Sequence, residues 1–135
     1  MAAVDTATIR VLIVDNHELL RTTLAIDLNQ YAGLEVVGLA ANGEEAIAQT
    51  EALLPDVILM DLQMPVMDGF TASKQIKRDY PKIYIIAYTS LDDPQIEVIA
   101  QSVPVDQVCY KDTKTEVLVQ LIRQARDSQC SENQG

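Results

Sequence analysis

The sequence predicts an α/β fold in which helices cover both faces of a parallel β-sheet. Five short apolar runs alternate with segments of helical periodicity, and the runs span Ile9–Val14, Leu34–Ala40, Asp56–Met60, Ile83–Tyr88 and Val105–Tyr110. The first and third runs each contain four consecutive apolar residues, which is typical of strands that are buried on both faces. Regular alternation of strands and helices favours parallel strands joined by crossover helices.

The helical segments are predicted from apolar stripes with a period near 3.6 residues. The stripes consist of Leu20, Leu24 and Leu28; of Ala46, Ile47, Thr50, Leu53 and Leu54; of Ile96, Ile99 and Ala100; and of Val117, Leu118, Leu121, Ile122 and Ala125. Pro55 and Pro81 stand just before the third and fourth runs, where they end the preceding helices. Five such strand–helix units predict a flavodoxin-like (βα)5 doubly wound sheet with strand order 2-1-3-4-5.

The length of 135 residues fits one domain with a substantial core. We expect a flexible N-terminus over residues 1–8, one folded domain over 9–127, and a polar tail or the start of a linker over 128–135. No apolar run approaches the roughly 20 residues of a membrane helix, and the N-terminus lacks the basic and apolar segments of a signal peptide. A cytoplasmic protein without membrane contact is therefore predicted.

The charge of the chain argues against nucleic-acid binding by this segment alone. Twenty acidic residues outnumber ten basic ones, which gives a net charge of −10. Affinity for nucleic acid depends largely on clustered Lys and Arg that neutralise phosphates. Cys109 and Cys130 have no nearby Cys or His at metal-ligand spacing, so a zinc site is not supported either.

Polar residues follow the predicted strands where a doubly wound sheet binds its ligands, at the carboxyl ends. They are Asp15, Asn16 and His17; Asp61 to Pro65; Thr89 and Ser90; and Lys111 and Asp112. Asp15 and Asp61 follow central strands and should converge, which requires a cation such as Mg²⁺ between them. With Lys111 and Thr89 in the same pocket, the residues would hold a tetrahedral anion, and they indicate phosphoryl transfer to a carboxylate.

These stretches resemble the receiver domain of bacterial two-component response regulators, and most of all the branch with a LuxR-type helix-turn-helix output domain. The matching segments are Val11–Arg21, Pro55–Gly69, Ile85–Ser90 and Lys111–Asp112, in family order and spacing. The most specific segment ends in Met-Pro-Val-Met-Asp-Gly at Gly69. The resemblance covers the chain from Ile9 to Ala125.

The resemblance implies a role for each matching residue. Asp61 would accept a phosphoryl group from a phosphohistidine of a sensor histidine kinase. Asp15 would organise Mg²⁺, and Gln63 would offer its backbone carbonyl to the metal. Thr89 would turn towards the phosphoryl group, and Lys111 would pair with one of its oxygens. The chain would then be no conventional enzyme, because it would catalyse only its own phosphorylation and dephosphorylation.

The sequence departs from the family pattern at three places. Asn16 stands where most relatives carry an acid that contacts the metal, so a weakened ligand and weaker Mg²⁺ binding are predicted. Val108 stands where the family usually has the aromatic switch residue, and valine cannot make its inward rotation. Tyr110 lies on the same strand face by alternation, so it is a candidate substitute. Pro104 stiffens the approach to the fifth strand, where relatives are Gly-rich.

A purely structural role is the alternative for the residues that follow the first strand. Asp15 and Asn16 are both good N-cap residues and could serve only to start the first helix. His17, the only histidine, is predicted to be a surface or capping residue and not a ligand.

The residues that follow the first strand also argue against two classes of enzyme that share this fold. The acidic loop after the first strand would repel the flavin phosphate that flavodoxins bind, and no G-x-G-x-x-G segment is present. Phosphatases of the haloacid-dehalogenase type need a second Asp where this chain has His17.

Two functions stay in competition. The first is a phosphorylated switch with a transcriptional output, which would bind DNA only through a C-terminal output domain beyond this chain and would dimerise through the fourth helix, fifth strand and fifth helix. The alternative, motivated by Asn16 and Val108, is a degenerate receiver that acts as a protein-interaction module with weak phosphorylation or none.

Overall fold

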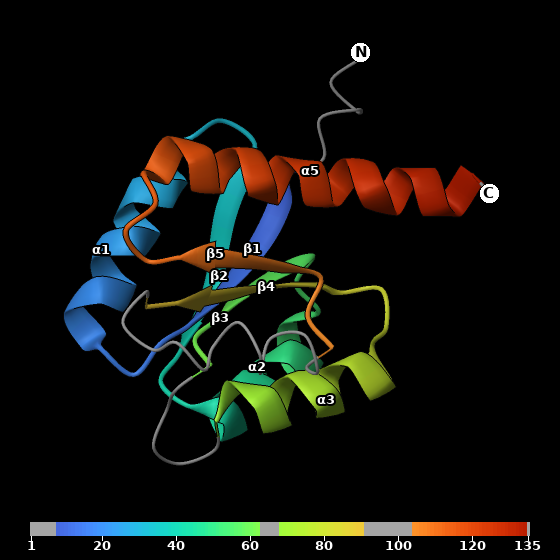
Figure 1. The fold of residues 1–135 in the computed structure, drawn as a ribbon, viewed down its shortest axis with the longest axis horizontal. Helices are drawn as coiled ribbons and strands as arrows, with labels where there is room; N and C mark the ends of the chain where they lie inside the picture. Colours follow the sequence, from blue (N-terminus) through green and yellow to red (C-terminus); the bar gives the residue numbers. More distant parts are fainter. Residues whose placement is uncertain (1–7, 63–67, 91–103, 135) are drawn as a thin grey trace.

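The computed structural model of the chain describes residues 8–62, 68–90 and 104–134, with side chains as far as Asp127 (Figure 1). Five strands form one sheet in the order β2-β1-β3-β4-β5, and each neighbouring pair is parallel. The strands are β1 (Ile9–Val14), β2 (Leu34–Ala40), β3 (Val57–Met60), β4 (Tyr84–Thr89) and β5 (Gln107–Tyr110). The predicted fold class and strand order are confirmed.

Two aspartates explain why β3 and β5 begin later than the apolar runs suggested. Asp56 donates its backbone N–H to the carbonyl of Arg10 at 2.9 Å, and its carboxylate accepts the N–H of the same residue at 2.9 Å. Asp106 makes the same pair of bonds with Ile85, each at 2.8 Å. At both positions, a side-chain carboxylate accepts the N–H that a backbone carbonyl of the neighbouring strand would otherwise accept. Each aspartate therefore lies at the amino end of the sheet, just before its strand begins.

The described helices are α1 (Glu18–Asn29), α2 (Gly43–Leu53), α3 (Gly69–Asp79) and α5 (Thr115–Gln134). Figure 1 shows α1 and α5 on one face of the sheet and α2 and α3 on the other. None of these helices, in the part of the chain that the structure describes, is long and apolar enough to span a bilayer. The helix predicted around residues 96–100 lies outside the described residues, as does the N-terminal segment 1–7.

The last helix, α5, extends to Gln134 and so includes most of the segment predicted to be a polar tail or the start of a linker. The segment lacks an apolar stripe, yet it contains no Gly or Pro before Gly135, so nothing in its backbone chemistry ends the helix earlier. The proposed division into terminus, domain and tail otherwise remains a prediction.

The core consists of two apolar layers, one on each face of the sheet. Alternate residues of β1 point to opposite layers: Val11 and Ile13 pack with α1 and α5, whereas Leu12 and Val14 pack with α2 and α3. All four are at most 1% exposed, which confirms the prediction of strands buried on both faces. The sheet is therefore a rigid base for the residues at its carboxyl edge.

Gly38 in β2 is required by the packing of α2. An added Cβ would collide with the Gln49 side chain and lie 2.8 Å from Leu53 Cδ1. Gln49 donates from Nε2 to the carbonyl of Leu39 at 2.6 Å, and this bond would be disturbed. Gly38→Ala is expected to lower the free energy of unfolding by about 1–2 kcal/mol, as moderate overpacking does, measured by urea denaturation. Because only side chains block the Cβ, Gln49→Ala should relieve part of that loss; additive losses would contradict this explanation.

Candidate functional site

The two acidic residues at the tips of β1 and β3 lie next to each other. Val14 pairs with Met60 in the sheet, so Asp15 and Asp61 follow directly paired residues at the same edge. The N–H of Asp61 donates to the Val14 carbonyl at 2.9 Å and so fixes the start of the loop. Asp15 is 1% exposed and Asp61 is 4% exposed. Two buried carboxylates at one edge require a positive charge nearby.

Lys111 supplies that charge from the tip of β5. Its backbone N–H donates to the Thr89 carbonyl at 2.7 Å, which places the side chain over the edge of the sheet. Its Nζ lies 2.9 Å from Asp15 Oδ2 and 3.2 Å from Asp61 Oδ2. The ammonium thus bridges both carboxylates, and the three groups together carry one net negative charge. The site therefore has both the oxygen donors and the residual charge that suit a divalent cation.

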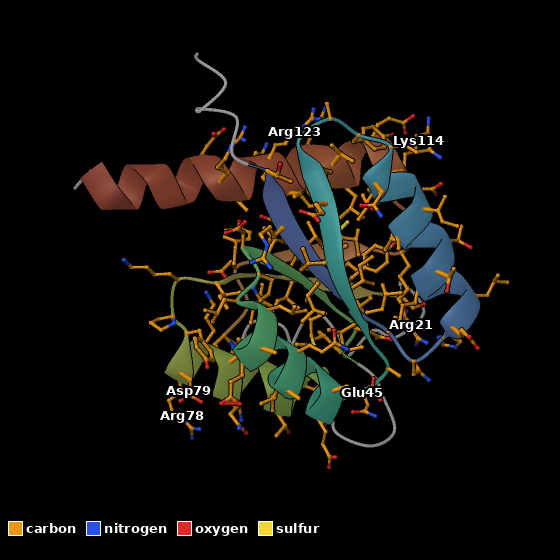
Figure 2. All side chains as sticks on the ribbon, turned by 180° about the vertical axis from the view of Figure 1, so that it is seen from behind. Arg21, Glu45, Arg78, Asp79, Lys114 and Arg123 are labelled. Atoms are coloured by element: carbon orange, nitrogen blue, oxygen red, sulfur yellow. The ribbon has the colours of Figure 1, made fainter. Side chains whose placement is uncertain are left out.

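Asp15 is held from a second side by the start of α1. The backbone N–H of His17 donates to Asp15 Oδ1 at 2.8 Å, and His17 Nδ1 lies 3.2 Å from the same oxygen. Arg21, in the first turns of α1 (Figure 2), donates from Nη1 to the Asp15 carbonyl at 2.6 Å. Sequence reasoning gave Arg21 no role, because its reach back to β1 depends on the direction in which α1 leaves the strand.

The capping interpretation of this tip is wrong. His17 is the N-cap residue of α1, and it makes no side-chain capping bond. Asp15 and Asn16 precede the N-cap position, so neither caps α1 in the usual way. The Asp15 carboxylate supports the helix start through the backbone N–H of His17 and also contacts Lys111.

For three predicted site residues, Asn16, Gln63 and Thr89, the structure describes no side-chain hydrogen bond. Asn16 is exposed and takes part in none of the hydrogen bonds found within residues 8–62, 68–90 and 104–127. Gln63 lies outside the described residues. Thr89 is 1% exposed at the tip of β4, and its hydroxyl has no partner among the described residues. A buried hydroxyl that lacks a partner costs free energy, so Thr89 is poised to bind an added polar group.

Gly69 brings α3 against the backbone of the β3 tip, a role that sequence reasoning missed. Asp68 is the N-cap of α3, and its side chain accepts the Thr71 N–H at 2.8 Å. A Cβ at Gly69 would collide with the backbone oxygen of Asp61 and lie 2.8 Å from Leu62 Cα. Only glycine permits this approach, so the first turn of α3 helps to fix the position of Asp61.

β5 contains Val108, a predicted departure from the family's switch, and Tyr110, the predicted candidate substitute. Val108 is half-buried and packs against the layer formed with α2 and α3. Tyr110 is half-buried and shares its strand face by alternation. On the other face, the Tyr88 ring centre lies 6.0 Å from Lys111 Nζ. Burial is the main reason that the pKa of Tyr88 is raised to about 12, and the nearby Cys109, Asp15 and Asp112 add to this rise. The phenol therefore stays neutral and adds no further charge to the site.

One group of potential metal ligands occurs among the residues that the structure describes at this edge. Ligand atoms of Asp15, His17 and Asp61 all lie within 4.8 Å of one another. The two carboxylates fit Mg²⁺, which binds few protein oxygens and keeps several waters.

Comparisons with known proteins agree with this geometry. The family described as "Response regulator receiver domain" matches residues 11–123. The response regulator protein VraR of Staphylococcus aureus is 40% identical over 116 residues, which is 86% of this chain and 56% of the relative. The chain therefore spans about half the length of the curated relatives that it matches.

Solved structures are similar over most of the chain. The response regulator domain of Thermotoga maritima CheB aligns over 89% of this chain and 97% of that chain, with a TM-score of 0.79 and 30% identity. A LuxR-family two-component response regulator from Aurantimonas sp. aligns over 87% and 84%, with a TM-score of 0.79 and 26% identity.

Proposed function

The chain belongs to the response-regulator receiver domain family, and we propose that it accepts a phosphoryl group on Asp61 from a sensor histidine kinase in the presence of Mg²⁺. The family and the LuxR-type branch predicted from the sequence are supported by the matches above. The observation that carries the proposal is the convergence of Asp15, Asp61 and Lys111 at one edge of the sheet.

In the proposed reaction, a carboxylate oxygen of Asp61 attacks the phosphorus of a phosphohistidine. The new oxygen–phosphorus bond forms as the nitrogen–phosphorus bond breaks, and the imidazole leaves with the electron pair and takes up a proton. Bound Mg²⁺ would be held by Asp15 and Asp61 and would supply positive charge to the phosphoryl oxygens.

The protein's own groups would stabilise the transferred phosphoryl group. Lys111 Nζ already lies 3.2 Å from Asp61 Oδ2, so its charge is adjacent to any group attached there. Thr89 offers a buried hydroxyl without a partner among the described residues, and it would donate to a phosphoryl oxygen. Movement of Thr89 towards that oxygen would start the switch.

Asn16 is expected to determine how tightly the site binds Mg²⁺. An amide oxygen binds Mg²⁺ without charge, so Asn16→Asp is expected to tighten Mg²⁺ binding about tenfold or more, in the range typical for one added carboxylate near a metal. Titration with Mg²⁺, followed by calorimetry, measures this. Asn29→Asp adds the same charge to an exposed position at the far end of α1. Equal Mg²⁺ affinity in the Asn16→Asp variant and the wild type would show that residue 16 does not face the metal.

The output and partners follow from the same proposal. A sensor histidine kinase would be the phosphoryl donor, and the cytoplasm would be the place where they meet. A C-terminal output domain would bind DNA, in keeping with relatives of which the matched segment is only 56%. Dimerisation would use the surface of β5, α5 and the segment between β4 and β5.

A degenerate receiver is the second candidate, and Asn16 together with Val108 favours it. The test is incubation with Mg²⁺ and acetyl phosphate, followed by intact-protein mass measurement. A working receiver gains one phosphoryl group, and Asp61→Asn removes the gain. No gain at saturating Mg²⁺, in either the wild type or Asn16→Asp, would support the degenerate receiver.

A further inference from the structure

We propose that His17 is a third metal ligand of this site, so that Asp15, His17 and Asp61 bind a divalent transition ion such as Zn²⁺ more tightly than Mg²⁺. The inference rests on the metal site of the proposed function but not on phosphoryl transfer. Its basis is the mixed set of two carboxylates and one imidazole whose ligand atoms lie within 4.8 Å of one another.

The two oxygens of Asp15 face different partners. Oδ2 lies 2.9 Å from Lys111 Nζ, whereas Oδ1 lies 3.2 Å from His17 Nδ1. An ion between His17 and Asp15 can therefore bind without displacing the ammonium from Oδ2. Ligands of Zn²⁺ stand about 2.0–2.2 Å from the ion, which places them about 3–4 Å from each other. His17 Nδ1 and Asp15 Oδ1 already stand at such a separation, and a carboxylate oxygen of Asp61 lies within 4.8 Å of the other ligand atoms.

The imidazole is available for such a role. His17 is the N-cap of α1, but its side chain caps nothing. The ring is 68% exposed and meets the described part of the protein through Asp15. The helix start therefore does not need the ring, and exposure leaves it free to turn. Ligation through Nδ1 would leave Nε2 with its proton in contact with water.

The chemical type of the ligand atoms determines which metal ion the site prefers. Asn16 replaces an acid of the usual Mg²⁺ site with a neutral amide, and Mg²⁺ prefers oxygen ligands. Imidazole nitrogen instead suits Zn²⁺, Ni²⁺ and Cu²⁺. A neutral amide at residue 16, next to an imidazole nitrogen at residue 17, therefore favours the later transition ions over Mg²⁺.

The experiment uses the fact that His17 is the only histidine of the chain. The tag-free protein, with Cys130→Ser to remove one alternative thiol ligand, is titrated with Zn²⁺ while the ¹⁵N signals of the imidazole are recorded. We expect the Nδ1 signal to shift in a saturable manner at one equivalent of Zn²⁺. An Nδ1 signal that does not respond while Zn²⁺ binds would overturn the proposal.

Calorimetry of a variant pair adds a second readout. His17→Gln is expected to weaken Zn²⁺ binding about tenfold or more, because direct ligands matter at least as much as their supporting partners, and to weaken Mg²⁺ binding much less, since Mg²⁺ prefers oxygen ligands. Glu18→Gln, at the exposed neighbouring position, should leave both unchanged. If Glu18→Gln weakens Zn²⁺ binding as much as His17→Gln, the ion is attracted by diffuse negative charge and the proposal is wrong.

The result also separates this inference from the proposed function. If Asp61 is phosphorylated with Mg²⁺ but Zn²⁺ does not reach His17, only the inference fails. If Zn²⁺ binds His17 but Asp61 gains no phosphoryl group, only the proposed function fails.

Discussion

Replacing Gly69 by alanine is expected to lower the free energy of unfolding by about 2–3 kcal/mol and to slow phosphorylation of Asp61. The added Cβ would collide with the backbone oxygen of Asp61 and would lie 2.8 Å from Leu62 Cα. The atoms that the Cβ would meet belong to the buried backbone just after β3, which cannot move as flexible side chains do, so the cost falls at the upper end of the range for overpacking. The displaced carboxylate would also lose its alignment with Lys111.

Urea denaturation and the rate of phosphorylation by acetyl phosphate measure the two effects. Thr71→Ala is the matched control, because it changes an exposed residue in the same first turn of α3. The control should keep the wild-type rate. A Gly69→Ala variant with wild-type stability and rate would show that α3 does not constrain the β3 tip.

Replacing Lys111 by methionine is expected to destabilise the metal-free protein by about 2–3 kcal/mol. The variant keeps the apolar stem but removes the ammonium that lies 2.9 Å from Asp15 and 3.2 Å from Asp61. Breaking a fully buried ion pair costs about 3–5 kcal/mol, and the 20% exposure of the Lys111 side chain reduces that penalty. Thermal or urea unfolding in EDTA measures the loss.

Added Mg²⁺ should restore part of the stability of Lys111→Met, since the ion replaces the missing charge and binds only the folded state. Lys114→Met removes an exposed charge near the start of α5 (Figure 2) and should change neither stability nor its dependence on Mg²⁺. A Lys111→Met protein as stable as the wild type in EDTA would contradict the role of the ammonium as counter-charge.

The strand tips were predictable because parallel strands end at one edge. Asp15, Asp61 and Lys111 each follow an apolar run, and the strand order alone brings them together. The limits of β1 and β2 were predicted correctly, because each strand coincides with its mainly apolar run. β3 and β5 begin later than predicted, because the side chains of Asp56 and Asp106 accept hydrogen bonds that backbone carbonyls accept within a strand.

Residues that act through the direction of a helix were not predictable. Arg21 and His17 reach Asp15 only because α1 leaves β1 at a particular angle. Gly69 matters only because α3 starts against the backbone of the β3 tip. No local pattern in the sequence encodes these approaches. The extension of α5 to Gln134 was not predictable from periodicity, because residues 128–134 contain no apolar stripe.

The most direct test of the account is to locate the phosphoryl group. The protein is incubated with Mg²⁺ and acetyl phosphate, treated with hydroxylamine, which converts an acyl phosphate to a hydroxamate, and digested for peptide mass mapping. We predict a hydroxamate at Asp61, which disappears without Mg²⁺ and in Asp61→Asn. An unmodified Asp61 at saturating Mg²⁺, in both the wild type and Asn16→Asp, would contradict the assignment of this edge as a phosphoryl-acceptor site.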